Sequence, residues 1–231
     1  MKQILSAVAL LLALSLLAAC GGAPAPASPA APDPAPASAS PEASTPAEPA
    51  VPEKLIIGLD DQFPPKGIRD DTNQLVGFDI DLAKAVCDKL GIEAVPTPIN
   101  WTSKEGELNG GKVDVLWNGL TITPARQETM LMSTAYIANA QVIVVGKDSG
   151  IQTLADLAGK VVALQDGSSA DEAYAACAAA GTEKELVKAP ENISLFSDLK
   201  IGRIDAVVID KVFGDYYIAE NGEGKLTILE E

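Results

Sequence analysis

The stretch "GKVDVLW" at residues 111–117 returns as "GRIDAVV" at residues 202–208, and this echo bears most directly on the fold. In both copies a glycine ends a predicted helix, a basic residue follows, and an aspartate opens an apolar strand. If the echo is more than a chance similarity of two turns, each half of the molecule builds its own sheet. A strand of each sheet then ends at a common crevice, where ligands of open α/β sheets bind.

Around the echo, short apolar runs alternate with helical patterns, which predicts α/β layers with largely parallel sheets. The helix predicted over 78–90 carries Phe78, Leu82, Val86 and Leu90 on one apolar stripe and stops at Gly91. A capping box at 169–172 opens another helix, which ends at Gly181. The remaining predicted helices cover 192–201 and 211–220, and the predicted strands cover 54–59, 113–117, 141–145, 160–164, 205–209 and 225–229.

Composition excludes several classes of function. The chain has 231 residues and a formal net charge of −15, which argues against binding to nucleic acid and against electrostatic docking on anionic lipid. It contains no histidine, so the commonest general base and metal ligand are both absent. We therefore expect no metal site, no cofactor and no histidine-assisted nucleophile. Cys87 and Cys177 lie in apolar helical patterns and are expected to be buried thiols rather than a disulfide.

The N-terminus predicts export. A short positive start and an apolar run ending in Leu-Ala-Ala-Cys predict a signal peptide over 1–19. This ending resembles the lipobox of bacterial lipoproteins, which makes Cys20 the expected site of lipidation; an ordinary secretory signal with an incidental cysteine is the alternative. Residues 20–53 are rich in Ala, Pro and Ser and lack aromatic residues, so we expect a tether rather than a folded segment.

Arg126 in "GLTITPARQETM" (119–130) is the first candidate for ligand binding. Thr123 is a plausible N-cap and Pro124 a natural first helical residue, which puts Arg126 in the opening turn. A cation there opposes the helix dipole unless an anion shares the site. The alternative is an exposed arginine that pairs with Glu128 or with a neighbouring acid. If the echo is structural, Arg126 and Asp210 face one cleft from opposite sides, which suits a ligand with both a carboxylate and an ammonium group.

Four motifs carry a resemblance to a known family. "GFDIDLAKAVCDKLG" (77–91), "GKVDVLWNGLTITPAR" (111–126), "LADLAGKVVALQDGSS" (154–169) and "GRIDAVVID" (202–210) resemble, in this order, the polar amino-acid-binding subunits of bacterial ABC importers. These are type II periplasmic solute-binding proteins of family 3. The resemblance implies two α/β lobes, here 54–138 and 139–231, that close on a ligand about a hinge.

The resemblance also implies roles for single residues. Arg126 would grip the α-carboxylate, and Asp210 the α-ammonium. Further contacts to the ligand would come from the first lobe at Gly119 and Thr121, and from N–H groups at a helix start in the second lobe, at Gly167, Ser168 and Ser169.

The side chain of the ligand is less constrained. The resemblance places Phe63 and Trp101 as aromatic faces on either side of it, with core packing as the alternative. It places Asp60 at the distal end of the ligand, with an exposed acid at a strand end as the alternative. Gln165 stands where relatives vary. Because no cationic counterpart to Asp60 is identified, we expect a polar uncharged or cationic amino acid.

The fold expected is therefore α/β, two-lobed and similar to type II periplasmic binding proteins. Relatives add a strand and helices after the strand matched by 225–229, so the first lobe is expected to be C-terminally truncated, with apolar surface left uncovered. The function expected is a non-enzymatic, extracytoplasmic receptor, lipid-anchored through Cys20, that delivers a free amino acid to an ABC permease. A sensory module and a dehydratase-type enzyme on the same scaffold are the alternatives.

Overall fold

The structure is a computed structural model that describes residues 51–221 and 224–229. The expected signal peptide, Cys20 and nearly all of the expected tether lie outside these residues. The described residues belong to one compact unit, and no helix among them is long and apolar enough to cross a bilayer. Within this unit, residues 51–138 are called the first half and residues 139–229 the second half.

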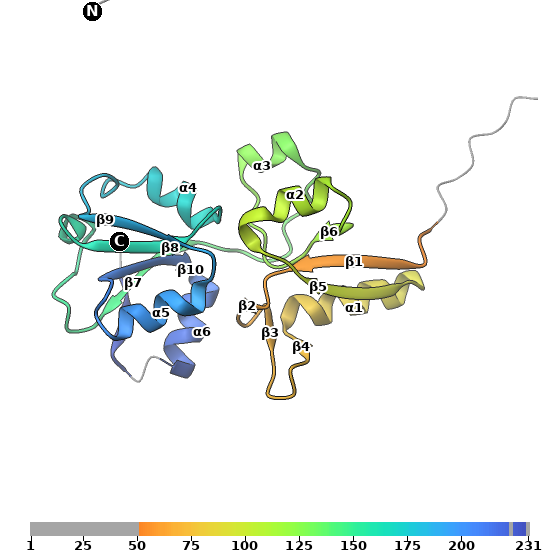
Figure 1. Cartoon of the computed structure of the whole chain (residues 1–231), viewed down its shortest axis with the longest axis horizontal. Helices are drawn as coiled ribbons and strands as arrows, with labels where there is room; N and C mark the ends of the chain where they lie inside the picture. The colour runs from red at the N-terminus through yellow and green to blue at the C-terminus, as the bar shows by residue number, and fades with distance from the viewer. Residues whose placement is uncertain (1–50, 222–223, 230–231) are drawn as a thin grey trace, which may run out of the picture. The chain divides into compact units, whose positions relative to one another are not determined.

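The first half carries two small sheets (Figure 1). In the main one, β1 lies between β5 and β6 and runs parallel to both. The second is an antiparallel meander that follows β1. The strands are β1 (Lys54–Leu59), β5 (Glu93–Pro98) and β6 (Val115–Leu116) in the main sheet, and β2 (Gln62–Phe63), β3 (Gly67–Arg69) and β4 (Leu75–Val76) in the meander.

The second half carries a five-stranded sheet in the order β11-β7-β10-β8-β9. Side chains alternate between its faces, so that Ala206 and Val208 pack toward α4 while Val207 and Ile209 pack toward α5 and α6. The strands are β7 (Gln141–Gly146), β8 (Val161–Gln165), β9 (Glu185–Ala189), β10 (Ala206–Asp210) and β11 (Leu226–Ile228); the helices are α4 (Ser169–Ala175), α5 (Asn192–Lys200) and α6 (Lys211–Asn221).

The internal echo is confirmed in atomic detail. Asp114 donates its N–H to Ile56 O at 2.8 Å and accepts from Ile56 N at 2.7 Å through its carboxylate. Asp205 likewise donates its N–H to Val161 O and accepts from Val161 N through its carboxylate, both at 2.8 Å. In each copy the basic residue after the glycine forms an ion pair at 3.0 Å with an acid five residues earlier. The aspartate of each copy thus fixes the register of its strand against a parallel neighbour, β1 or β8.

Helix α1 (Phe78–Leu90) ends at the left-handed Gly91 as predicted, but its predicted buried stripe is wrong. The buried positions are Asp79, Ile80, Ala83 and Cys87, whereas Phe78 and Leu90 are 47% and 59% exposed. The face that packs against β1 carries Ala83 and Cys87, which form a buried cluster with Ile57. Leu82 and Val86 instead line an apolar groove described below.

Two other expectations fail locally. The N-cap of α4 is Ser168, with no side-chain cap, and α4 ends at Ala175, because Ser169 uses its hydroxyl in tertiary hydrogen bonds and residues 176–182 form turns. A capping box does form elsewhere, from Thr153 to Asp156, at the start of η2 (Leu154–Leu157). Cys87 and Cys177 are free thiols, the first buried and the second partly buried.

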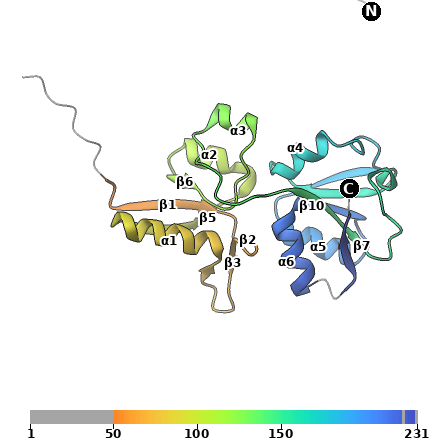
Figure 2. The same ribbon diagram turned by 180° about the vertical axis from the view of Figure 1, so that it is seen from behind.

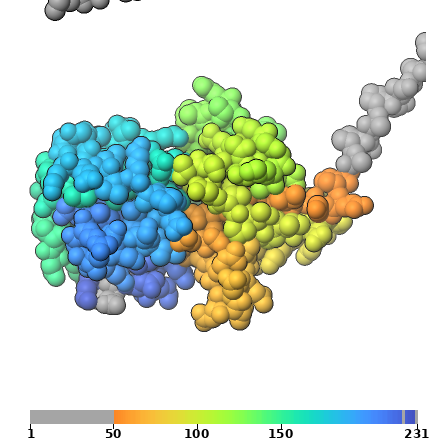
Figure 3. All heavy atoms as spheres, viewed as in Figure 1, coloured from red at the N-terminus to blue at the C-terminus, as the bar shows by residue number. Residues whose placement is uncertain are grey.

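A single chain segment, 131–140, leads from the first half to the second and forms no helix or strand (Figure 2). The two halves also touch directly. Where η1 (Trp101–Ser103) and α2 (Lys104–Asn109) begin, atoms of the first half meet the loop after β8 (Figure 3).

Candidate ligand-binding site

Arg126 lies in the first turn of α3 (Pro124–Thr129), as predicted, with Thr123 as the N-cap that accepts from Arg126 N at 3.3 Å. The interpretation of an exposed arginine paired with Glu128 is wrong, because Arg126 is only 4% exposed. Its guanidinium donates to Thr121 O at 2.9 Å and to Gly167 O at 3.4 Å. Among the described residues no carboxylate lies within ion-pair distance of it. Burial lowers the pKa of Arg126.

Asp210 ends β10 and is almost fully buried. It accepts hydrogen bonds from the side-chain amides of Asn139 and Gln141. Burial nevertheless raises the pKa of Asp210, and these two hydrogen bonds and the charges of Arg126 and Lys66 oppose the rise. Asp210 thus feels the charge of Arg126 but forms no ion pair with it. Each of the two side chains could therefore still pair with an opposite charge.

Hydroxyl groups link the two halves at this point. Ser169 Oγ donates to Thr121 Oγ1 at 3.1 Å and accepts from Gln141 Nε2 at 3.0 Å. Asn139 Nδ2 also donates to Thr121 Oγ1, at 3.2 Å. Ser168, which precedes Ser169, is buried, and its hydroxyl has no hydrogen-bond partner among the described residues. The predicted residues Thr121, Arg126, Ser168, Ser169 and Asp210 are therefore brought together.

Asp60, directly after β1, is 6% exposed, so the interpretation of an exposed strand-end acid is wrong. Its carboxylate accepts from Gln165 Nε2 of the second half at 2.8 Å and from Gln62 N at 2.8 Å. Two further hydrogen bonds fix the Gln165 side chain: it donates to Pro190 O and accepts from Asn192 Nδ2, both at 2.9 Å. Burial raises the pKa of Asp60 above its ordinary value, and the hydrogen bonds oppose the rise.

The two predicted aromatic faces behave differently. Phe63 packs in the core of the second half, with its ring centroid 5.4 Å from that of Phe213. This is the core-packing alternative, and these contacts do not support a ligand-facing role for Phe63. Trp101 is buried at the contact between the halves, where the ammonium of Lys104 lies 5.4 Å from the centroid of its ring.

Two buried lysines, and the groups around one of them, were missed by reasoning from the sequence. Lys66 lies 3.8 Å from Asp79, and Asp79 accepts a hydrogen bond from the hydroxyl of Tyr136 at 2.8 Å. This cluster lies under Gly119, whose N–H donates to the same hydroxyl at 3.2 Å. The other is Lys104, 3% exposed. Nothing in the local pattern marks either lysine as buried, because lysine is among the residues most often exposed.

These lysines add buried cations near the predicted residues, but neither lies within ion-pair distance of Asp60. Among the residues that the structure describes, three acidic and three basic side chains are buried: Asp60, Asp79 and Asp210, and Lys66, Lys104 and Arg126. Of these six buried side chains, only Lys66 and Asp79 pair with each other. Lys104 and Arg126 both donate to Gly167 O, whereas Asp60 and Asp210 accept hydrogen bonds only from neutral groups.

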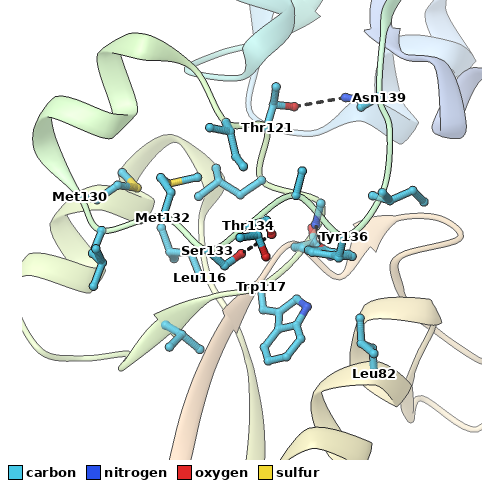
Figure 4. Close-up of a pocket in the computed structure, with 18 of the residues that line it drawn as sticks. Leu82, Leu116, Trp117, Thr121, Met130, Met132, Ser133, Thr134, Tyr136 and Asn139 are labelled. Carbon is cyan, nitrogen blue, oxygen red and sulfur yellow. Dashed lines mark hydrogen bonds between the residues drawn. The ribbon is translucent and has the colours of Figure 1, made fainter.

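A separate apolar groove lies outside this polar site. The groove, of about 780 Å³, is on the first half, and Arg126 and Asp210 do not line it. Figure 4 draws Met130 and Met132 beside Leu116, with Trp117 and Leu82 further along the groove. Gly119, Thr121 and Asn139 form its edge toward the polar site. No group of three or more metal-binding side chains occurs among the residues described.

Comparison with known proteins decides the family. Residues 55–193 match the bacterial extracellular solute-binding proteins, family 3. The chain belongs to this family. Three family relatives illustrate the likeness: the arginine-binding extracellular protein ArtP of Bacillus subtilis is 34% identical over 74% of this chain, the L-cystine-binding protein TcyJ of Escherichia coli 30% over 68%, and the histidine-binding periplasmic protein of Salmonella typhimurium 34% over 74%. The chain covers 66%, 59% and 65% of these relatives, respectively.

Solved structures support the same assignment. A substrate-binding protein of a Streptococcus pneumoniae ABC uptake transporter with bound histidine aligns with a TM-score of 0.73 and 36% identity, over 77% of this chain and 74% of that one. An ancestral arginine-binding protein bound to arginine aligns with a TM-score of 0.72 and 37% identity, over 77% and 79%. The α/β fold of type II periplasmic binding proteins is therefore confirmed for this family member.

Proposed function

We propose that this chain is an extracytoplasmic receptor that binds one free amino acid between two lobes, 54–138 and 139–231, and passes it to an ABC importer. The observation that carries the proposal is the buried guanidinium of Arg126, which has no carboxylate partner among the described residues and lies in the field of the buried Asp210. Buried charges are normally paired. A zwitterion supplies both missing partners.

The α-carboxylate of the ligand binds Arg126, because a planar fork can form two parallel charge-assisted hydrogen bonds to it. Thr121 and Ser169 lie within hydrogen-bond reach of one another and add hydroxyl groups from both lobes. N–H groups of the segment 167–169 complete this end, except that of Ser168, which is donated to Gln165 O. The N–H of Gly119 is donated to Tyr136, so its carbonyl is the backbone group left for the ligand. The α-ammonium binds Asp210, whose present partners are two neutral amides.

The ligand side chain extends toward Asp60 and Gln165, and Trp101 is the aromatic face that remains available for it. A buried carboxylate with only neutral partners favours a cation. Lys66 is paired with Asp79 and Lys104 donates to Gly167 O, so neither lysine neutralises Asp60, and an acidic side chain placed beside Asp60 would be repelled. The ligand is therefore a cationic or polar uncharged amino acid. The relatives named for binding arginine and histidine support this choice.

Placement follows from the sequence before residue 54. A signal peptide over 1–19 directs export and is removed. The lipid on Cys20 and a tether over 20–53 then hold the receptor on the outer side of a bacterial membrane, beside its permease. Export of a fusion that carries residues 1–53, with and without Cys20→Ser, tests this part by membrane fractionation. Release of both forms into the soluble fraction would contradict lipid anchoring.

The binding function is tested by native mass spectrometry followed by calorimetry. The protein should co-purify with an amino acid, and a panel of arginine, lysine, histidine, glutamine and glutamate should show measurable binding with glutamate among the weakest. Absence of binding to every amino acid would contradict the receptor function. Tightest binding to glutamate would overturn only the assignment of the side chain.

A further inference from the structure

Lys104 is an unusual residue for its position. It opens α2 and is 3% exposed, although a lysine at a helix start opposes the helix dipole and a buried ammonium loses its hydration. The exposed Lys112, a few residues later, pairs with Glu107 in the ordinary way. Lys104 forms no ion pair among the described residues, and burial together with the charge of Arg126 lowers its pKa.

What Lys104 does contact is the other half of the molecule. Its ammonium donates to Gly167 O at 2.7 Å, in the loop between β8 and α4. Arg126 directs its guanidinium to the same carbonyl at 3.4 Å. Two cations from the first half thus converge on one backbone oxygen of the second half. The ring of Trp101, 5.4 Å away, shields the ammonium from water.

The backbone around Gly167 is shaped for this contact. Gly167 has a φ of +66°, which favours glycine, and an added Cβ would lie 3.6 Å from Lys104 Nζ and 3.8 Å from Thr102 Cα. The loop therefore brings its carbonyl close to the start of α2. Separation of the halves removes this carbonyl from Lys104 and returns the ammonium to water.

We propose that Lys104 is a positioning residue that latches the two halves together through Gly167 O and does not touch the ligand. It raises the population of the closed arrangement before any ligand arrives, so that ligand binding has less rearrangement to drive. The effect on ligands rests on the proposed receptor function. The latch itself does not, because it is a property of the protein without ligand.

The test is an interlobe distance measured by pulsed electron–electron double resonance on the full chain. Spin labels at Asp71→Cys and Glu220→Cys, both exposed, report on the two halves, and the three native cysteines are replaced by alanine or serine. Without ligand, Lys104→Met should lower the ratio of closed to open molecules about tenfold, the value of a charge-assisted hydrogen bond. Lys104→Gln, which shortens and neutralises the donor, should act in the same direction if the methionine variant folds poorly.

Lys112→Met is the matched control and should leave the distances unchanged. With L-arginine as the probe, Lys104→Met should speed dissociation about tenfold and leave the ratio of affinities for arginine and histidine unchanged. The latch is overturned if the parent shows no closed population, or if both Lys104 variants give the same distance distribution as the parent. It is also overturned if Lys112→Met has an equal effect, or if Lys104→Met changes the ratio of affinities for arginine and histidine. If no amino acid binds but the distances shift as expected, the receptor function fails and the latch stands.

Discussion

At the scale of single residues, the candidate site contains buried carboxylates and a buried guanidinium, and the burial of each charge costs free energy. Asp60 and Asp210 both have a raised pKa because burial penalises their charged form. Neither has an ion pair among the residues described. Under the proposed receptor function, these carboxylates lower the stability of the protein and are retained for ligand recognition.

This burial predicts how Asp60→Asn changes the pH dependence of stability. The native pKa of Asp60 lies above its ordinary value of 3.8, so the native state releases this proton less readily than the unfolded chain. As pH rises from 3.8 to 7, the parent loses the contribution of the protonated carboxyl to its free energy of unfolding. The variant has no carboxyl at this position and keeps its free energy of unfolding in this respect. The stability of the variant relative to the parent should therefore increase over this range, as measured by urea unfolding at several pH values. A difference that stays constant or decreases would contradict the buried placement of Asp60.

At the scale of elements, the two aspartates of the internal echo fix strand starts. Asp205 accepts from Val161 N in a partly buried setting, and Asp114 accepts from Ile56 N in an exposed one. We predict that Asp205→Ala lowers the free energy of unfolding by about 1–3 kcal/mol, because Val161 N–H loses its partner where water replaces it poorly. Asp114→Ala should cost less.

Chemical denaturation measures both changes, with Asp71→Ala at an exposed turn as the control. A larger loss for Asp114→Ala than for Asp205→Ala would contradict the difference in burial between the two strand starts.

Elements with a strong local signal could be predicted from the sequence. The start of α1 and its end at Gly91, the N-cap Thr123 and the echoing strands β6 and β10 follow from capping, glycine and apolar patterns. Strand β5 was missed because Pro96 and Pro98 argue against a strand, yet an edge strand tolerates them. The buried face of α1 was missed because tertiary packing, not the widest apolar stripe, decided which way the helix turns.

The site could be predicted only in part, for a related reason. Arg126 stood out because its local electrostatics are unfavourable, and Asp210 because it ends an echoed strand. Lys66, Lys104 and Tyr136 carry no comparable local signal, since their roles arise from contacts 13 to 63 residues distant in sequence. Phe63 follows a pattern that fits both a ligand contact and a core, and only its packing on Phe213 separates the two.

At the scale of the whole molecule, the two halves have unequal cores. The second half contains two clusters of buried apolar residues on the faces of a five-stranded sheet. The main sheet of the first half has three strands, a small cluster around Ile57, Ala83 and Cys87, and the apolar groove beside it. Leu131, at one side of this groove, is fully exposed.

This inequality predicts a difference in hydrogen exchange. Amides of β1 and β5 should exchange faster than those of β8 and β10, because fewer buried contacts oppose local opening of the smaller sheet. Mass spectrometry after proteolysis resolves the two groups of peptides. Equal protection of both sheets would contradict the account of the cores. Exposure of the groove also predicts that Leu131→Ser leaves the protection of β1 unchanged.

The central claim is that Arg126 holds the carboxylate of an amino acid, and one calorimetric cycle tests it. The parent and Arg126→Ala are each titrated with L-arginine and with its α-amide, which lacks the carboxylate charge. The parent should prefer the amino acid over the amide by about 2–5 kcal/mol, and Arg126→Ala should lose most of this preference together with affinity for the amino acid. If Arg126→Ala binds L-arginine as tightly as the parent does, or discriminates equally against the amide, the carboxylate does not bind at Arg126.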